Sequence, residues 1–167
     1  LAGFGAPVAI TATMILALGV KPLKAAITVL LANTAPVAFG AVAVPIVTAG
    51  DVGGKDPHII ATIVGHQAPF LAMFVPVILL FILDGMKGVK DGWLPAFVIG
   101  ISFAIAQWIT AATPAYNLTD VVACIVSMGA AVLFLRFWKP RGVEGVRERY
   151  GLPSQVEEKE ALPAVRV

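Results

Sequence analysis

The chain has 167 residues, of which 59% are hydrophobic and only 13% are charged, and its mean hydropathy is +0.91. Because about a quarter of the residues of an ordinary soluble domain are charged, this composition argues against a soluble domain. The formal net charge of +2 offers no basic, solvated face of the kind that nucleic-acid binding requires. The sequence shows neither a nucleophile–base arrangement nor a cluster with metal-ligand spacing, so we expect no enzyme, no metal site and no cofactor.

Charge-poor runs, taken in chain order, predict membrane-spanning helices. A helix needs about 20 mostly apolar residues to cross a hydrocarbon core of about 30 Å. Five runs approach or exceed this length, so we expect an all-α membrane protein with about five transmembrane helices, some interrupted by Pro or Gly. The predicted transmembrane region is 1–138, with spans at 1–20, 25–49, 59–83, 92–112 and 118–138. The length of the second run leaves open whether it crosses fully or folds back as a re-entrant hairpin.

The distribution of lysine and arginine predicts the orientation, because short cytoplasmic loops carry an excess of both residues. Five alternating crossings put the first and third loops on the same side as the residues after the last run. Counted only as far as Arg149 in the proximal tail, that side then holds nine basic residues against one, Lys55, on the other. We therefore expect a multi-pass protein of the plasma membrane, with residues 139–167 forming a cytoplasmic loop or tail. The nine are Lys21, Lys24, Lys87, Lys90, Arg136, Lys139, Arg141, Arg147 and Arg149.

Polar and helix-breaking residues interrupt the second run at "ANTAPVAFG", residues 32–40, which contains Asn33, Thr34 and Pro36. Polar groups in hydrocarbon are unfavourable unless they are paired, so they usually face a bundle interior or a cavity. A broken helix can present free N–H groups to an anion and free carbonyls to a cation. Ordinary proline kinks and close packing of small residues are the alternative explanation. A near-repeat, "GAPVAI", occurs at residues 5–10, and the candidates there are Gly3, Gly5 and Pro7.

Other polar residues within the runs are further candidates. His66 is the only histidine inside a run and is followed by Gln67. A histidine can bind a carboxylate when protonated and can release a proton near neutral pH, although a neutral His bonded to a neighbouring helix is the plainer interpretation. Asp120 is either an N-cap of the last helix or part of an ion pathway. We expect Gln107 to help helix packing or to lie near an interface, and His58 to be solvated.

Several of these motifs resemble the bacterial L-lactate permease family, which includes glycolate permeases. The similar segments are "GFGAPVAI", "ANTAPVAFGAV", "DGMKGVK" and "SFAIAQ". The resemblance implies a proton-coupled symporter for L-lactate, glycolate and other small 2-hydroxymonocarboxylates in the cytoplasmic membrane. Members of the family have more spans than this chain. It would therefore be a piece of a larger transporter bundle, with the remaining half of the same permease and the lipid bilayer as partners, and no nucleic acid.

Residue chemistry and the resemblance together predict two groups of site residues. The proton-coupling candidates are His66 and Asp120. The predicted substrate-binding residues are Gly3, Gly5, Pro7, Asn33, Thr34, Pro36, His66 and Gln67. Two alternatives stay open, namely a sodium-coupled or other carboxylate transporter, and a non-transporting membrane scaffold or sensor subunit.

Overall fold

The computed structural model describes residues 5–138, and the regular elements in this range are helices. Gly3 and the predicted cytoplasmic segment 139–167 lie outside the described residues. The elements are α1 (Gly5–Ala17), α2 (Pro22–Ala32), α3 (Gly40–Gly53), α4 (Pro57–Ala72), α5 (Val75–Ala111), the 3-10 helix η1 (Tyr116–Leu118) and α6 (Thr119–Phe137).

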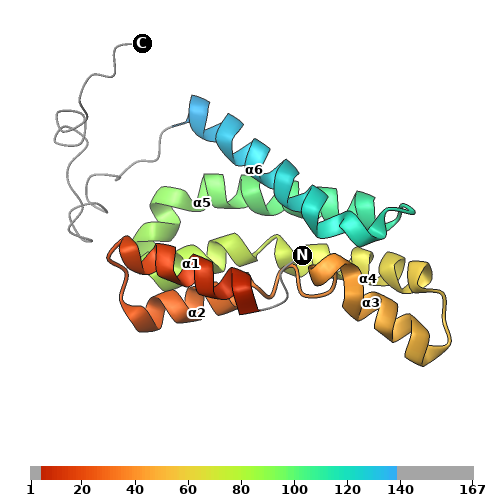
Figure 1. The fold of residues 1–167 in the computed structure, drawn as a ribbon. Coiled ribbons are helices and arrows are strands. Elements are labelled where there is room, and N and C mark those ends of the chain that lie inside the picture. The colour runs from red at the N-terminus through yellow and green to blue at the C-terminus, as the bar shows by residue number, and fades with distance from the viewer. Residues whose placement is uncertain (1–4, 139–167) are drawn as a thin grey trace, which may run out of the picture.

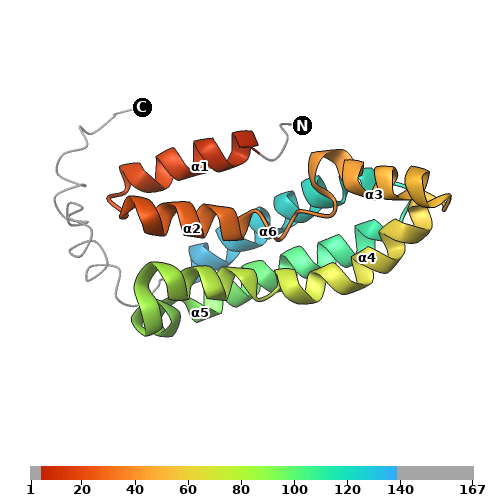
Figure 2. The same ribbon diagram turned by 90° about the horizontal axis from the view of Figure 1, so that it is seen from below.

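The chain runs back and forth along one direction (Figures 1 and 2). α1 and α2 lie side by side and antiparallel, and α3 continues in the direction of α2 after a break. α4 and the first part of α5 return along the opposite direction, the chain reverses at the start of the second part of α5, and α6 packs antiparallel to that part. Helix is present in each of the predicted spans, although several passes are built from two shorter helices.

The break between α2 and α3 explains why the second run is not one helix. Asn33 ends α2, and Pro36 follows in a stretch of turns that closes with a hydrogen bond of 2.7 Å from the Gly40 N–H to the Pro36 carbonyl. Proline cannot donate a backbone hydrogen bond, so it favours a turn over helix interior. The first turn of α3 is left-handed, with φ of 50°, 63° and 58° at Ala41, Val42 and Ala43. Such φ values are uncommon for residues other than glycine.

A second break separates α4 from α5 at Met73 and Phe74. The backbone at this break lies very close to the backbone of α5, because a Cβ built on Gly100 of α5 would lie 2.2 Å from the Met73 carbonyl oxygen. Gly65 of α4 makes a similar approach, with Ala111 as its neighbour. Small residues of this kind let helix backbones pack tightly where hydrophobic side chains supply little driving force. Gly100 and Gly65 therefore hold α4 and its break against the second part of α5.

α5 reverses at Gly85, where φ is 64° and ψ is −151°. Only glycine adopts this conformation readily, so Gly85 permits the reversal of the chain at this point. By length and apolar composition, two helical stretches of residues 5–138 are long enough to cross a membrane, Pro57–Ala111 and Tyr116–Phe137. α1, α2 and α3 are apolar but shorter. An all-α membrane architecture is thus consistent with the structure, while the number of crossings stays a prediction.

A cluster of buried apolar residues in the described part of the chain lies where α3, α4 and the end of α5 meet. It consists of Phe39, Ala43, Ile46, Ala61 and Ala111, and further buried apolar residues lie in α2, α5 and α6. Large apolar side chains elsewhere are exposed, among them Phe70 at 71% and Leu71 at 76%. Apolar surface of this extent is unfavourable in water and marks contact with other protein or with lipid.

Candidate functional site

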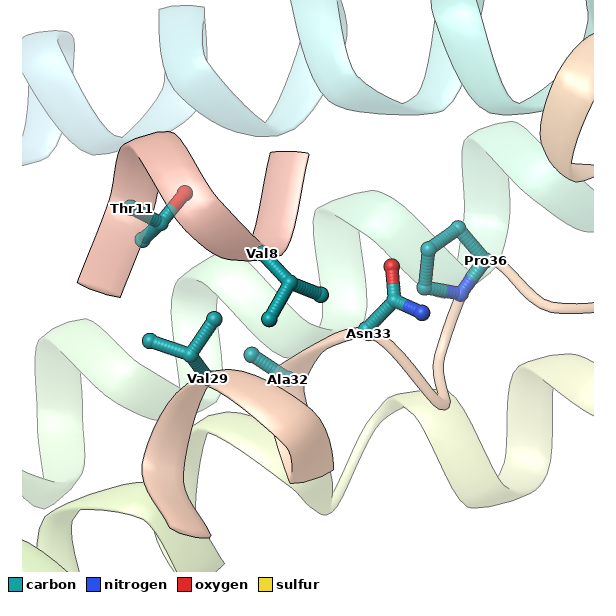
Figure 3. Close-up of a pocket in the computed structure, with 6 residues that line it drawn as sticks. All are labelled: Val8, Thr11, Val29, Ala32, Asn33 and Pro36. Atoms are coloured by element: carbon teal, nitrogen blue, oxygen red, sulfur yellow. The ribbon is translucent and has the colours of Figure 1, made fainter. Parts of the chain in front are cut away.

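The break after α2 opens a hollow between α1 and α2 (Figure 3). Its volume is about 180 Å³, and its lining is mostly apolar, with Asn33 and Thr11 as the polar members. Ligand sites for drug-sized molecules range from about 300 to 1,000 Å³, so this hollow matches a much smaller molecule. The lining residues are Val8, Thr11, Val29, Ala32, Asn33 and Pro36.

Asn33 supplies the most versatile polar group of the hollow. Its backbone N–H ends α2 by donating to the Val29 carbonyl at 3.0 Å. The side-chain amide lies beside Pro36 and near Val8 (Figure 3), and within residues 5–138 it makes no hydrogen bond. An amide offers two donor hydrogens and an acceptor oxygen. Asn33 can therefore donate to a carboxylate and accept from a hydroxyl group.

Thr34 does not join Asn33 and Pro36 in the lining. It is exposed, and its hydroxyl donates to the Leu31 carbonyl at 2.5 Å. That carbonyl belongs to the last turn of α2, where carbonyls lack partners inside the helix. In the structure, then, Thr34 closes the end of α2 while its two neighbours in the motif face the hollow.

The two near-repeats adopt different structures. Gly5 and Pro7 lie in the first turn of α1, where Pro7 directly precedes the lining residue Val8, whereas Pro36 lies in the break. Proline fits the first turn because its missing N–H would have no partner there. The hollow therefore adjoins the N-terminal turn of α1, whose free N–H groups and dipole favour an anion. Of the first motif, Gly3 lies outside the described residues.

His66 and Gln67 lie apart from this hollow, exposed on α4. The His66 Nδ1 is 2.6 Å from the Thr62 carbonyl oxygen, and its ring meets the Trp108 ring edge-on at 5.8 Å. Because a carbonyl only accepts, Nδ1 carries the proton in this contact and Nε2 is the nitrogen left for other partners. The structure thus orients His66 through α4 and α5 without bringing it to Asn33.

Asp120 is not the N-cap of the last helix. The cap position of α6 is Leu118, and Asp120 is the second residue of the helix without a capping hydrogen bond. Instead, its Oδ1 accepts a hydrogen bond of 3.4 Å from Nε2 of Gln107. Gln107 is fully buried and joins α5 to α6, which fits the expected role in helix packing. Sequence reasoning missed this pair, and the only signal was a glutamine within an apolar run.

Tyr116 and His58 pack near the start of α6 at the same end of the bundle. Their rings meet edge-on at 5.9 Å. Asp56 is the N-cap of α4, with its Oδ1 accepting from the His58 N–H at 2.9 Å. His58 is therefore half-buried against η1 and not fully solvated as expected. α3 contacts both η1 and α6 here, whereas the hollow lies between α1 and α2.

Comparison with known proteins gives the family. A family model described as L-lactate permease matches residues 1–161. The chain belongs to the L-lactate permease family. Glycolate permease GlcA of Escherichia coli is 50% identical over 143 residues, which are 86% of this chain and 26% of that protein. L-lactate permease of Salmonella typhimurium is 48% identical over 139 residues, 83% of this chain and 25% of that protein.

L-lactate permease of Bacillus subtilis is also similar, at 44% identity over 140 residues, 84% of this chain. The chain spans about a quarter of the length of these L-lactate permease relatives. No solved structure matches it. The resemblance inferred from the Pro-rich motifs is thus confirmed, and the hollow lies between the two segments that carry them.

Proposed function

We propose that the protein containing this chain imports L-lactate, glycolate and related small 2-hydroxymonocarboxylates by proton symport. Membership of the L-lactate permease family is the observation that carries the proposal. The names of the relatives, glycolate permease and L-lactate permease, indicate the class of substrate. Because the chain spans about a quarter of those proteins, the complete site includes residues from the rest of the permease.

The hollow is proposed to hold one end of the substrate. A 2-hydroxycarboxylate presents an anionic carboxylate that only accepts and a hydroxyl group that both donates and accepts. The carboxylate suits the N-terminal turn of α1, with Gly5 and Pro7, together with the Asn33 amide hydrogens. The amide oxygen of Asn33 suits the hydroxyl group. Pro36 shapes the wall and Thr34 holds the end of α2, while Gly3, outside the described residues, stays a predicted substrate-binding residue.

His66 and Gln67 are proposed to reach the substrate from the side of the remaining permease. Both are exposed on α4 within the described residues, so this face is available to helices from the other part of the protein. The Trp108 ring and the Thr62 carbonyl fix the imidazole. His66 is thus one candidate for proton coupling, and Asp120 is the other.

The passes of the chain are proposed to cross the plasma membrane five times, with 139–167 in the cytoplasm. α2 has 11 residues and α3 has 14, and each is shorter than the about 20 residues that a span requires. They run in the same direction on either side of the break (Figure 2), so together they form one crossing. The break then lies at membrane depth, where irregular backbone is tolerated next to a cavity or other protein.

Uptake by the complete permease tests this function. Radiolabelled L-lactate and glycolate are offered to cells or proteoliposomes under an imposed proton gradient, and separately under an imposed sodium gradient. We expect accumulation of both substrates with the proton gradient alone. Accumulation with sodium alone would establish the sodium-coupled alternative, and the absence of uptake under both gradients would contradict the proposal.

A further inference from the structure

Gln107 of α5 and Asp120 of α6 each have one unused oxygen. The amide Nε2 donates to Asp120 Oδ1 at 3.4 Å. Within residues 5–138, the Gln107 Oε1 and the Asp120 Oδ2 are both buried and make no hydrogen bond. Gln107 is fully buried, at 0% exposure. A buried polar atom without a partner destabilises a protein by about 1–3 kcal/mol, so two such atoms in one contacting pair require an explanation.

The two oxygens cannot satisfy each other while Asp120 is ionised, because an ionised carboxylate and an amide oxygen are both acceptors. Protonation changes this. A proton from water that binds to Asp120 Oδ2 creates an O–H donor, and the Gln107 amide already bonds the same carboxyl group through Oδ1. The acid O–H then donates to Oε1 while Nε2 donates to Oδ1, which closes a ring of two hydrogen bonds.

We propose that Gln107 and Asp120 form an amide–acid pair that is complete only when Asp120 carries a proton. The pair is a proton-binding site, and Gln107 is its positioning residue. When the proton leaves to water, Asp120 becomes a carboxylate and one of the two hydrogen bonds is lost. The inference depends on the proposed function only for its connection to transport, since the pair itself is defined without a substrate.

The basic residues of α5 and α6 do not supply an alternative partner. The basic residues of α5 are Lys87 and Lys90, and 17 residues separate Lys90 from Gln107, or about 25 Å of helix. Arg136 lies in the last turn of α6, about 24 Å along that helix from Asp120. No cation of the described residues therefore approaches the carboxylate along either helix.

Other titratable groups belong to the elements that pack around the start of α6. The titratable side chain of α6 nearest in sequence is Cys124, one turn beyond Asp120. The titratable side chain of η1 is Tyr116, whose ring contacts His58. α3 contributes Asp51 near its end, and Asp56 caps α4. Asp51 is exposed, and Asp56 already accepts from the His58 N–H. These groups leave Gln107 as the side chain that bonds the Asp120 carboxyl group.

Infrared difference spectroscopy of the purified complete permease in proteoliposomes tests the pair directly. Between alkaline and acidic pH, the wild type should gain the C=O band of a protonated carboxyl group. Asp120→Asn should lack that band. In Gln107→Met the band should move to higher frequency, because the acid has lost its donor and its acceptor. A band that is unaffected by Gln107→Met would overturn the proposal.

Two further variants keep the test decisive. Ser127→Ala changes another buried polar residue of α6, which bonds only the Cys124 carbonyl in the described structure, and should leave the band in place. If the Gln107→Met variant does not fold, the Gln107→Glu variant replaces it in the test. A second carboxyl group should retain the shared proton to higher pH, because two adjacent carboxylates repel. An unchanged titration midpoint in Gln107→Glu would contradict the pair.

Transport assays separate this inference from the proposed function. In Asp120→Asn the amide N–H can replace the acid O–H toward Gln107, so we expect L-lactate exchange to continue while accumulation above the outside concentration is lost. Accumulation like that of the wild type would overturn a coupling role for the pair. If the wild-type permease transports no 2-hydroxycarboxylate, the proposed function fails, and the infrared shift still decides whether the pair exists.

Discussion

Gly100 of α5 lies against the backbone of Met73, at the break between α4 and α5. A Cβ on Gly100 would lie 2.2 Å from the Met73 carbonyl oxygen and 3.0 Å from its carbonyl carbon. Because both atoms belong to the backbone, neither can rotate out of the way. The broken pass therefore depends on a glycine in the neighbouring helix.

Gly100→Ala is expected to destabilise the protein. Overpacking in a tight interior typically reduces the free energy of unfolding by about 1–3 kcal/mol. Gly129→Ala in α6 is the matched control, because a Cβ there meets nothing within 4 Å and alanine is the better helix former. Thermal unfolding in detergent should show a lower midpoint for Gly100→Ala only. Equal midpoints would mean that the close approach does not exist.

Asn33→Ala is expected to weaken substrate binding by the complete permease. Loss of a hydrogen bond to a charged group reduces binding by about 1.5–3 kcal/mol, which corresponds to a rise in KM of roughly 10- to 100-fold. Thr34→Val removes only the hydroxyl group that bonds the Leu31 carbonyl and should leave KM close to that of the wild type. Concentration-dependent L-lactate uptake at matched expression measures both values. A larger effect for Thr34→Val would reverse the assignment of the two residues.

Val42→Gly is expected to be neutral or stabilising. Val42 has a φ of 63°, and the left-handed conformation is unfavourable by roughly 1–2 kcal/mol for a residue with a Cβ. Val44 lies two residues further along α3 and is exposed. Val44→Gly should destabilise by about 0.5–1 kcal/mol, because glycine is a poor helix former. Unfolding midpoints that rank the two variants in the opposite order would contradict the left-handed turn.

Cysteine labelling tests the orientation. In a background where Cys124 and every other cysteine of the complete permease are replaced by serine, single cysteines replace Lys55 or Lys90, and intact cells are exposed to a membrane-impermeant maleimide. Lys55→Cys should react and Lys90→Cys should react only after the cells are opened, because the predicted loops lie on opposite sides of the membrane. Labelling of both in intact cells would rule out the proposed topology.

Sequence patterns predicted the all-helical fold because apolar length and proline position act locally, while the bounds and number of the membrane spans stay predictions. Pro36 and Gly85 interrupt the chain for reasons that their own backbone chemistry supplies. The family was also accessible from the Pro-rich motifs. Local patterns did not show that the Thr34 hydroxyl turns back onto α2, where it shares the Leu31 carbonyl with the Thr34 backbone N–H.

Long-range pairs were less accessible from the sequence. Gln107 and Asp120 are 13 residues apart on different helices, and the turn at η1 brings them together. No helical or strand period has that spacing, so neither residue predicts the other. His66 is the opposite case. Its chemistry predicted a site residue, but it lies on an exposed face of α4, so its proposed binding partners belong to the rest of the permease.

Proton movement measured during transport tests the central claim most directly. L-lactate is added to lightly buffered, energy-depleted cells that express the complete permease, and the external pH is recorded. We expect a rise in external pH as protons enter with lactate, with the same response to glycolate and none in cells without the permease. Lactate entry without a pH change, or entry that requires sodium, would contradict proton symport.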